Sequence, residues 1–213
     1  VTEMKVAIEA SRALVYETSR VCDLENNNLR VLESNPPSDK DELKRRKSDS
    51  RVYKRLNGML TPMSKYYAGE MSVRVANDAL QVLGGSGHMA DYPVERHLRD
   101  ARITSIYEGT SQLQIVAAVR GVCSRAFDRR TEEFEAQSYS DDRLEDLKRQ
   151  LIGARELLRK GVAKVKEEGV TYMDLYGRQL VDALAQLAQG GLVEVLGDVS
   201  EVVAVGRDQR LIE

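Results

Sequence analysis

The chain has 213 residues, of which 42% are apolar, so it can bury one sizeable hydrophobic core. Its 32 basic and 34 acidic side chains nearly cancel, which excludes a strong overall field that would attract nucleic acid or an anionic membrane. The sequence shows neither a secretory signal nor an apolar run of about 18 residues that could span a membrane. Cys22 and Cys123 are far apart and form no CxxC motif, which favours the reduced thiols of a cytosolic protein.

The composition predicts an all-α protein. Only 4 prolines occur, aromatic residues make up 5%, and no run alternates between apolar and polar residues as a strand would. A first helix is expected over about 3–26, where apolar residues recur at helical spacing, and it should dissolve in the polar "ENNN". Pro36 and Pro37 exclude a continuous helix beyond that point.

A second helix is expected to follow these prolines. Ser38 is its predicted N-cap, with Asp41 three residues later and acids in the first turn. The helix begins polar, runs on over about 51–83 and has a possible kink at Pro62. Gly84 and Gly85 should end it. The predicted core face of its last part consists of Ala76, Ala79, Leu80 and Leu83.

After a short segment at 93–102, a further helix should begin near Thr110 and fade around 127–137. It presents Leu113, Val116 and Ala117 on one side. A third long helix is predicted to be capped by Ser140 and to end at Gly169, with a heptad-like repeat that is typical of antiparallel packing. The repeat contains Leu144, Leu147, Leu151, Ala154, Leu158 and Val165.

The last helix is predicted to be capped by Thr171 with Asp174, and Gly190 and Gly191 should interrupt it. Its apolar side carries Leu175, Leu180, Ala183, Leu184 and Leu187. The last two helices should form a helical hairpin. We therefore divide the chain into an antiparallel helical bundle, residues 1–136, and a C-terminal helical hairpin region, residues 137–213.

The glycine-rich stretch "LGGSGHMA" allows three interpretations. Gly85, Gly87 and Ala90 satisfy the loose dinucleotide fingerprint, but that motif needs a preceding strand, and here a helix precedes it. The stretch could simply stop a helix. It could also let exposed backbone amides approach a pyrophosphate closely, because glycine has no Cβ.

Glu108 lies at the predicted helix entrance, and the nearest charges along the chain are Arg102 and Arg120. It could be merely a polar helix start. It could also be a general base that takes a proton from an activated carbon, because a sheltered carboxylate is a better base than a hydrated one. The nearby Ile103, Ile106 and Tyr107 are expected to provide that shelter.

Other chemistry has weaker support. His88 and His97 do not share a helix face and no cysteine or HExxH pattern accompanies them, so no metal site is expected. The basic run at 44–51 is interleaved with acid and serine and lacks aromatic residues, which favours a solvated helix face over nucleic-acid binding. Arg99, Asp100 and Arg102 could form an ordinary surface ion-pair set.

Taken together, "ANDALQVLGGSGHMADYPVERHLRDARITSIYEGTSQLQ" resembles the C-terminal helical domain of the flavin-dependent acyl-CoA dehydrogenases. The combination of Q-x-L-G-G-x-G, D-Y-P-V-E-R, R-D-A-R and I-Y-E-G-T-S, in this order and spacing, is highly specific. A polar insert at about 24–50 and the hairpin after 136 resemble the longer bacterial branch of the family.

The resemblance implies α,β-desaturation of an acyl-CoA thioester in fatty-acid β-oxidation, with hydride transfer to the N5 atom of FAD. Glu108 corresponds to the base that removes the α-proton, and Gly109 and Arg120 correspond to substrate-binding residues. Thr110, Ser111 and Gln112 correspond to one contact with FAD. A second contact, with the flavin nucleotide of a neighbouring subunit, corresponds to Gln81, Val82, Leu83, Gly84 and Gly85.

The resemblance also implies a cytoplasmic bacterial homodimer or homotetramer that passes electrons to electron-transferring flavoprotein. The family encloses its flavin with an N-terminal helical domain, a β domain and opening helices that this sequence does not contain. We therefore expect the chain to be a fragment that by itself neither retains FAD nor turns over substrate. The alternatives are a non-catalytic helical oligomerisation module and an acyl-CoA oxidase.

Overall fold

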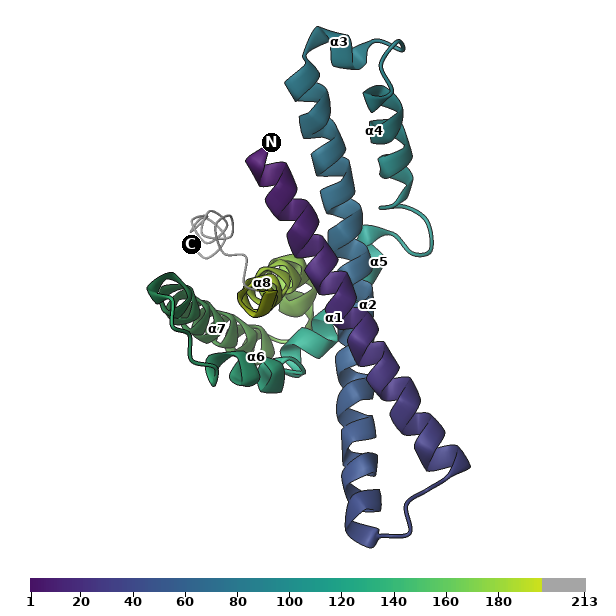
Figure 1. Ribbon diagram of the computed structural model, residues 1–213, viewed down its shortest axis with the longest axis vertical. Helices are drawn as coiled ribbons and strands as arrows, with labels where there is room; N and C mark the ends of the chain where they lie inside the picture. The colour runs from purple at the N-terminus through teal and green to yellow at the C-terminus, as the bar shows by residue number, and fades with distance from the viewer. Residues whose placement is uncertain (197–213) are drawn as a thin grey trace.

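The computed structural model describes residues 1–196, and every regular element of that part is an α-helix (Figure 1). The predicted all-α class is confirmed. The elements are α1 (Thr2–Ser34), α2 (Lys40–Leu83), α3 (Gly85–His88), α4 (Val94–Ile103), α5 (Ser111–Cys123), α6 (Asp128–Glu135), α7 (Asp142–Glu168) and α8 (Val170–Leu196).

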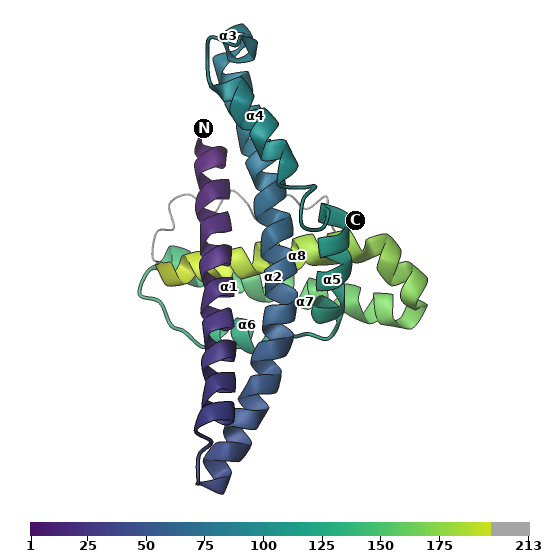
Figure 2. The ribbon, with the colours of Figure 1, turned by 90° about the vertical axis from the view of Figure 1, so that its right-hand side faces the viewer.

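The two longest helices, α1 and α2, form an antiparallel pair of 33 and 44 residues, about 50 and 66 Å long at 1.5 Å per residue. Around the loop 35–39 that joins them, they extend past the other helices as a two-helix arm (Figures 1 and 2). Residues 24–50, which were predicted to be an insert, lie in this arm. We define the arm as residues 24–55.

Helix α1 continues through its asparagines to Ser34, eight residues beyond the predicted end at about 26. The prediction was wrong because Asn28 is buried against α2 and donates a hydrogen bond of 2.7 Å to the carbonyl oxygen of Arg46. A tertiary contact thus overrides the weak helix propensity of asparagine.

The N-caps of α2 and α7 each lie one residue after the predicted serine. The Asp39 carboxylate accepts the amides of Asp41 and Glu42 at 3.3 and 3.2 Å, so Asp39 rather than Ser38 caps α2. Asp141 rather than Ser140 caps α7 and accepts the amide of Arg143 at 2.9 Å. A carboxylate also interacts more favourably with the positive end of the helix dipole.

The buried face of α2 lies earlier than predicted. Ala76, Ala79 and Leu80 are only partly buried and Leu83 is 46% exposed. The helices α5 and α8 instead cover the middle of α2, where the buried side chains are Leu56, Met59, Leu60, Met63 and Tyr66. The spacing of apolar residues predicts an apolar face on α2, but it does not determine which turns of that face another helix covers.

Helix α5 does not bury the apolar side that the sequence analysis identified. Leu113 is 60% and Val116 45% exposed, and Ala117 is exposed as well. Residues 128–135, where a fading helix was expected, form the separate helix α6. The buried residues of α5 are Ser111, Ile115, Ala118, Val119, Val122 and Cys123.

Helices α7 and α8 form the predicted hairpin, with Gly169 alone between them at a φ of +94°. Thr171 lies inside α8 and does not cap it, and Leu175 is exposed. Gly190 does not interrupt α8, which continues to Leu196. The Leu151 side chain occupies the space that a Cβ at Gly190 would need, so glycine at this position allows close packing of α7 on α8. Residues 197–213 of the predicted hairpin region lie outside the described residues.

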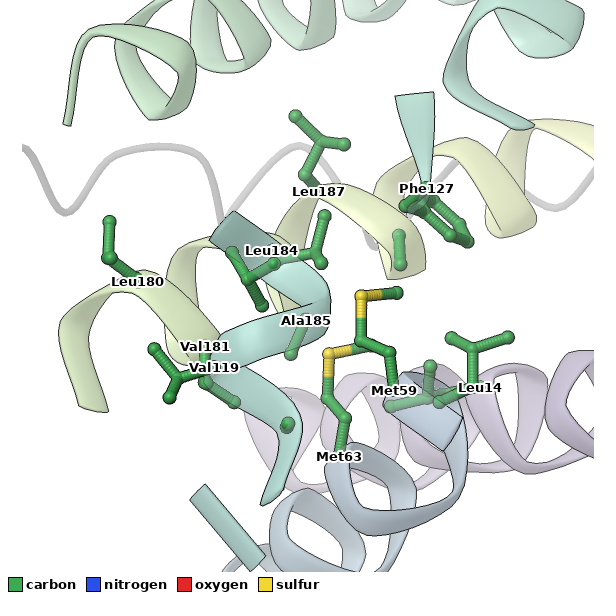
Figure 3. Close-up of a cluster of buried hydrophobic side chains, with 14 of the residues drawn as sticks. Leu14, Met59, Met63, Val119, Phe127, Leu180, Val181, Leu184, Ala185 and Leu187 are labelled. Atoms are coloured by element: carbon green, nitrogen blue, oxygen red, sulfur yellow. The ribbon is translucent and has the colours of Figure 1, made fainter. Parts of the chain in front are cut away.

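The hairpin lies crosswise to the long helices, so that α8 runs across α1 and α2 (Figure 2). One hydrophobic core joins all of them: Leu14 of α1, Met59 and Met63 of α2, and Val119 of α5 face a row of α8 side chains (Figure 3). That row comprises Leu180, Val181, Leu184, Ala185 and Leu187. The division of the chain at residue 136 stays a prediction.

Candidate active site

The loop between α4 and α5 carries Glu108 in an unusual backbone conformation. Glu108 has a φ of +49° and Gly109 a φ of +92°, so two consecutive residues are left-handed. Glycine adopts this region freely, whereas a residue with a Cβ pays about 1–2 kcal/mol. Such outliers in native proteins cluster at functional sites, where the surrounding structure holds them in place.

Two side chains hold the carbonyl groups of this left-handed pair. Lys65 of α2 donates from Nζ to the carbonyl oxygen of Gly109 at 2.6 Å. Gln114 of α5 donates from Nε2 to the carbonyl oxygen of Glu108 at 3.0 Å and also reaches that of Gly109 at 3.5 Å. The Lys65 ammonium further lies 5.3 Å from the ring centroid of Tyr107, within range of a cation–π interaction.

The two ends of the loop are anchored to α2 as well. At its start, Thr104 packs against Gly69, and its Oγ1 lies 3.2 Å from the Gly69 carbonyl oxygen and 2.7 Å from that of Ala101. At its end, the buried Ser111 donates from Oγ to the Glu70 carboxylate, and its amide donates to the Ser105 carbonyl oxygen at 3.1 Å. The loop is therefore tied to one stretch of α2 at both of its ends and at Gly109.

Helix α5 begins where the sequence predicted. Thr110 is its N-cap and accepts the amide of Leu113 at 3.4 Å through Oγ1. Glu108 lies two residues before this cap, beside the positive end of the helix dipole. The backbone amides of Glu108 and Gly109 donate no hydrogen bond to any of the described residues. They remain available to a bound acceptor atom.

The expected apolar shelter of Glu108 is wrong for this chain. Ile103, Ile106 and Tyr107 are 54%, 48% and 49% exposed, and Glu108 itself is exposed. The loop leaves α2 here, so these side chains point away from the core. Leu113 and Val116 of α5 are exposed as well, so large apolar side chains are exposed on both sides of Glu108 along the chain.

The predicted nucleotide turn lies far from this loop. Residues 81–85 are all exposed at the end of α2, and Gly84 has a φ of +58°. Gly69, which contacts the loop at Thr104, precedes Gly84 by 15 residues of helix, which corresponds to about 22 Å. The structure therefore does not bring Gln81, Val82, Leu83, Gly84 and Gly85 together with Thr110, Ser111 and Gln112 in one chain.

Among the other predicted residues, Gln112 and Arg120 lie on the exposed side of α5. Ser111 is buried, and its hydroxyl is already used by Glu70. Sequence reasoning missed Lys65, Glu70 and Gln114. The sequence carries no local signal for them, because the burial of Ser64 and Tyr66 on either side of Lys65 is seen only in the structure.

A partly buried polar network lies next to these anchors and joins α2 to α8. The Tyr66 hydroxyl donates to Asp182 at 2.8 Å and accepts from Arg178 Nη1 at 2.9 Å. Burial raises the pKa of Tyr66, and its hydrogen bond to Asp182 adds to that rise. Burial also raises the pKa of Asp182, although the Tyr66 hydroxyl and Arg178 oppose the rise.

An apolar groove of about 500 Å³ lies between α1, α2 and α4, and its lining does not include Glu108. Ala76 and Ala79, which were predicted to face the core, line it. Within residues 1–196 no group of three or more metal-ligating side chains occurs, and His88 and His97 form no such group. No helix in that part of the chain is long and apolar enough to cross a membrane.

Comparison with known proteins identifies one family. Residues 43–123 match the family model described as the C-terminal domain of acyl-CoA dehydrogenase. The acyl-CoA dehydrogenase of Bacillus subtilis (strain 168) is 37% identical over 112 residues, which cover 53% of this chain and 22% of that protein. The cyclohexane-1-carbonyl-CoA dehydrogenase of Syntrophus aciditrophicus (strain SB) is 44% identical over 66 residues, or 31% and 17% of the two chains.

Solved structures extend the likeness to nearly the whole fold. Caenorhabditis elegans ACDH-11, crystallised in complex with C11-CoA, matches 99% of this chain and 35% of its own, with a TM-score of 0.74 and 24% identity. The apo form of Bd2924 matches 90% of this chain and 32% of its own, with a TM-score of 0.54 and 19% identity. At these identities the likeness concerns the fold.

Proposed function

We propose, from the match of residues 43–123 to the C-terminal domain of acyl-CoA dehydrogenase, that the chain is the base-bearing part of an acyl-CoA dehydrogenase. The reaction is desaturation of an acyl-CoA thioester between its α and β carbons. The observation that carries the proposal is the left-handed backbone of Glu108 at the entrance of α5, inside the matched segment. Lys65 and Gln114 hold it there by hydrogen bonds to the carbonyl oxygens of Gly109 and Glu108.

Glu108 acts as the base that removes the α-proton of the thioester. Removing this proton places negative charge on the thioester oxygen, which needs donors that are already oriented. The unpaired amides of Glu108 and Gly109 are such donors, and the positive end of α5 stabilises the same charge. The clamp on their carbonyl groups keeps both the carboxylate and the amides in place.

The substrate itself completes the shelter that this chain leaves open. An acyl group over Ile103, Ile106, Tyr107 and Leu113 would cover exposed apolar surface and remove water from Glu108. A dehydrated carboxylate is a stronger base than a hydrated one. Gly109, without a side chain, allows the thioester to approach the loop.

The residues present fit an FAD that two chains hold together. Open space surrounds Gly84 and Gly85, so the turn 81–85 can approach a phosphate. Since the turn lies about 22 Å along α2 from Gly69, which contacts the loop that leads to α5, one copy would contribute the turn and another the α5 entrance. When bound, FAD supplies the acceptor for the hydride that leaves the β-carbon. This sharing supports a homodimer or homotetramer.

The isolated chain is then inactive, because its base is exposed and one copy does not place both flavin contacts together. Purified chain 1–213 should lose any flavin absorbance during gel filtration. A flavin band that co-elutes with the chain would contradict this part of the proposal.

A purely structural helical module is the less favoured alternative. Such a module would gain from glycine at position 108, since glycine avoids the backbone cost that Glu108 bears. Electron-transferring flavoprotein is the proposed electron acceptor. Comparing how fast oxygen and electron-transferring flavoprotein reoxidise the reduced full-length protein separates a dehydrogenase from an oxidase.

The decisive experiment is Glu108→Gln in the full-length protein that contains this chain. Dye-coupled oxidation of acyl-CoA should fall by roughly 10²- to 10⁴-fold, the usual contribution of a general base, while the flavin spectrum persists. Glu167→Gln, a change at an exposed glutamate of α7, is the control. Near-normal turnover in the Glu108 variant would assign the base to another residue.

A further inference from the structure

The first part of α2 carries an exposed stripe of positive charge. Successive residues of an α-helix are rotated by about 100°, so side chains three, four and seven residues apart share a face. Six cations of the arm fall within an arc of roughly 100° on this basis. The cationic stripe consists of Lys40, Lys44, Lys47, Arg51, Lys54 and Arg55, all exposed.

The stripe is not neutralised within the described part of the chain. None of its six cations forms an ion pair there, although acids lie on the same helix. Glu42 pairs with Arg46 at 3.0 Å, and Asp49 faces Arg129 of α6 at 4.0 Å. A chain with a net charge of −2 thus concentrates six unpaired positive charges on one exposed face, which favours an anionic ligand.

The stripe lies on the same face of α2 as the residue that clamps the Glu108 loop. Lys44, Arg51, Gly58 and Lys65 follow one another at intervals of seven residues, and each interval rotates the position by only about 20°. Between the stripe and Lys65 this face is open: Gly58 is exposed, and no atom lies within 4 Å of where its Cβ would be.

Helix α5 adds one more cation along this path. It runs antiparallel to α2, since Ser111 contacts Glu70 and a Cβ on Gly121 would lie 2.5 Å from the Cβ of Met59. Arg120, exposed on α5, is therefore level with the stretch of α2 between Lys65 and the stripe. Positive charge thus leads from the arm toward Glu108.

The length of this path matches the ligand of the proposed reaction. Lys54 precedes Lys65 by 11 residues, or about 16 Å of helix. The pantetheine arm between a thioester sulfur and the first phosphate of CoA has the backbone length of about four residues, which is roughly 15 Å when extended. A thioester at Glu108 would then place its diphosphate beside Lys54 and Arg55, at the end of the stripe nearest to Lys65.

We propose that the end of the cationic stripe nearest to Lys65 binds the phosphate groups of a CoA thioester whose acyl end lies at Glu108. The inference rests on the proposed function and names the part of the chain that recognises the nucleotide end of its substrate. Lysine and arginine bind phosphate through charge-assisted hydrogen bonds, which are stronger than neutral ones. The arm is then a substrate-binding element.

The test compares two substrates in the full-length protein with the triple variant Arg51→Gln, Lys54→Gln and Arg55→Gln. One substrate is an acyl-CoA, and the other is the same acyl group on pantetheine, which lacks phosphate. The kcat/KM preference for the CoA thioester over the pantetheine thioester should fall about tenfold in the variant. Added salt should reduce this preference in the unsubstituted protein more than in the variant.

Arg45→Gln is the matched control, because Arg45 is exposed on the same helix but rotated by about 100° from Lys44. It should leave the preference unchanged. An unchanged preference in the triple variant would overturn the inference, as would a variant that impairs only the reaction with a protein electron acceptor. Binding of CoA alone, measured by calorimetry, separates this inference from the proposed function. Equal CoA affinity of the unsubstituted protein and the triple variant would contradict phosphate binding by the stripe. An unsubstituted protein that oxidises no acyl-CoA would instead contradict the proposed function.

Discussion

Lys65 and Gly109 are 44 residues apart in the chain, yet the Lys65 ammonium donates a hydrogen bond of 2.6 Å to the Gly109 carbonyl oxygen. This contact joins the middle of the longest helix to the loop that carries Glu108. It makes Lys65 a positioning residue for the proposed base, since it acts on the backbone and forms no ion pair with the Glu108 carboxylate.

Lys65→Met is therefore expected to lower kcat in the full-length protein by about 10- to 100-fold, with a smaller change in KM, because small misplacements of a catalytic group cost about this much. Steady-state kinetics with an acyl-CoA measure the effect. Lys65→Arg should restore part of the activity. Lys160→Met, at an exposed lysine of α7, should leave kcat unchanged. A normal kcat in Lys65→Met would show that Gln114 holds the loop alone.

The backbone strain at Glu108 can be measured independently of activity. Glu108→Gly should be more stable than Glu108→Ala by about 1 kcal/mol, because only alanine pays for a positive φ, and the greater flexibility of unfolded glycine offsets part of the gain. Urea unfolding of both variants gives the difference. In the interior of α7 the order should reverse, so that Lys160→Ala is more stable than Lys160→Gly.

Two glycines on facing helices should respond to alanine in opposite directions. A Cβ at Gly121 would lie 2.5 Å from the Cβ of Met59, which cannot move without its backbone, so Gly121→Ala should cost roughly 1–3 kcal/mol. Gly58→Ala meets nothing within 4 Å and should gain about 0.5–1 kcal/mol from better helix propensity. Thermal unfolding distinguishes them, and similar effects at both sites would contradict the close packing of α5 on α2.

The Tyr66, Asp182 and Arg178 network predicts a pH-dependent stability. Burial raises the pKa of Asp182 in the folded state, so between about 3.9, the ordinary value, and this raised value the folded protein binds more protons than the unfolded one. The Asp182 contribution to stability is therefore complete below that window and is lost as the pH rises through it.

Asp182→Asn removes this titration. Relative to the variant, the unsubstituted protein should lose stability as the pH rises above about 4 and through the raised pKa of Asp182, as measured by urea unfolding at several pH values. A parallel pH dependence of the two proteins would show that Arg178 and Tyr66 fully compensate the burial of Asp182.

Much of the helix layout was predictable because it depends on local chemistry. The proline pair after Ser34, Gly84 and Gly169 end helices through their own backbone preferences, and Thr110 begins one with its own hydroxyl. The predictions of helix ends were wrong where a residue from another helix of the chain makes a contact. Helix α1 outlasts its asparagines because Asn28 meets α2, and α8 continues through Gly190 and Gly191 because side chains fill the space beside them.

The sequence by itself determined the helical class, the helix-breaking positions and the motif that contains Glu108, since each depends on residues close together in the chain. Only the tertiary structure decided which helix faces are covered, and with them the exposure of Ile103, Leu83 and Leu113. It alone brought Lys65 and Glu70 to the loop. The physical reason is that periodicity marks a face of a helix, whereas the neighbour that packs against it comes from a distant part of the chain.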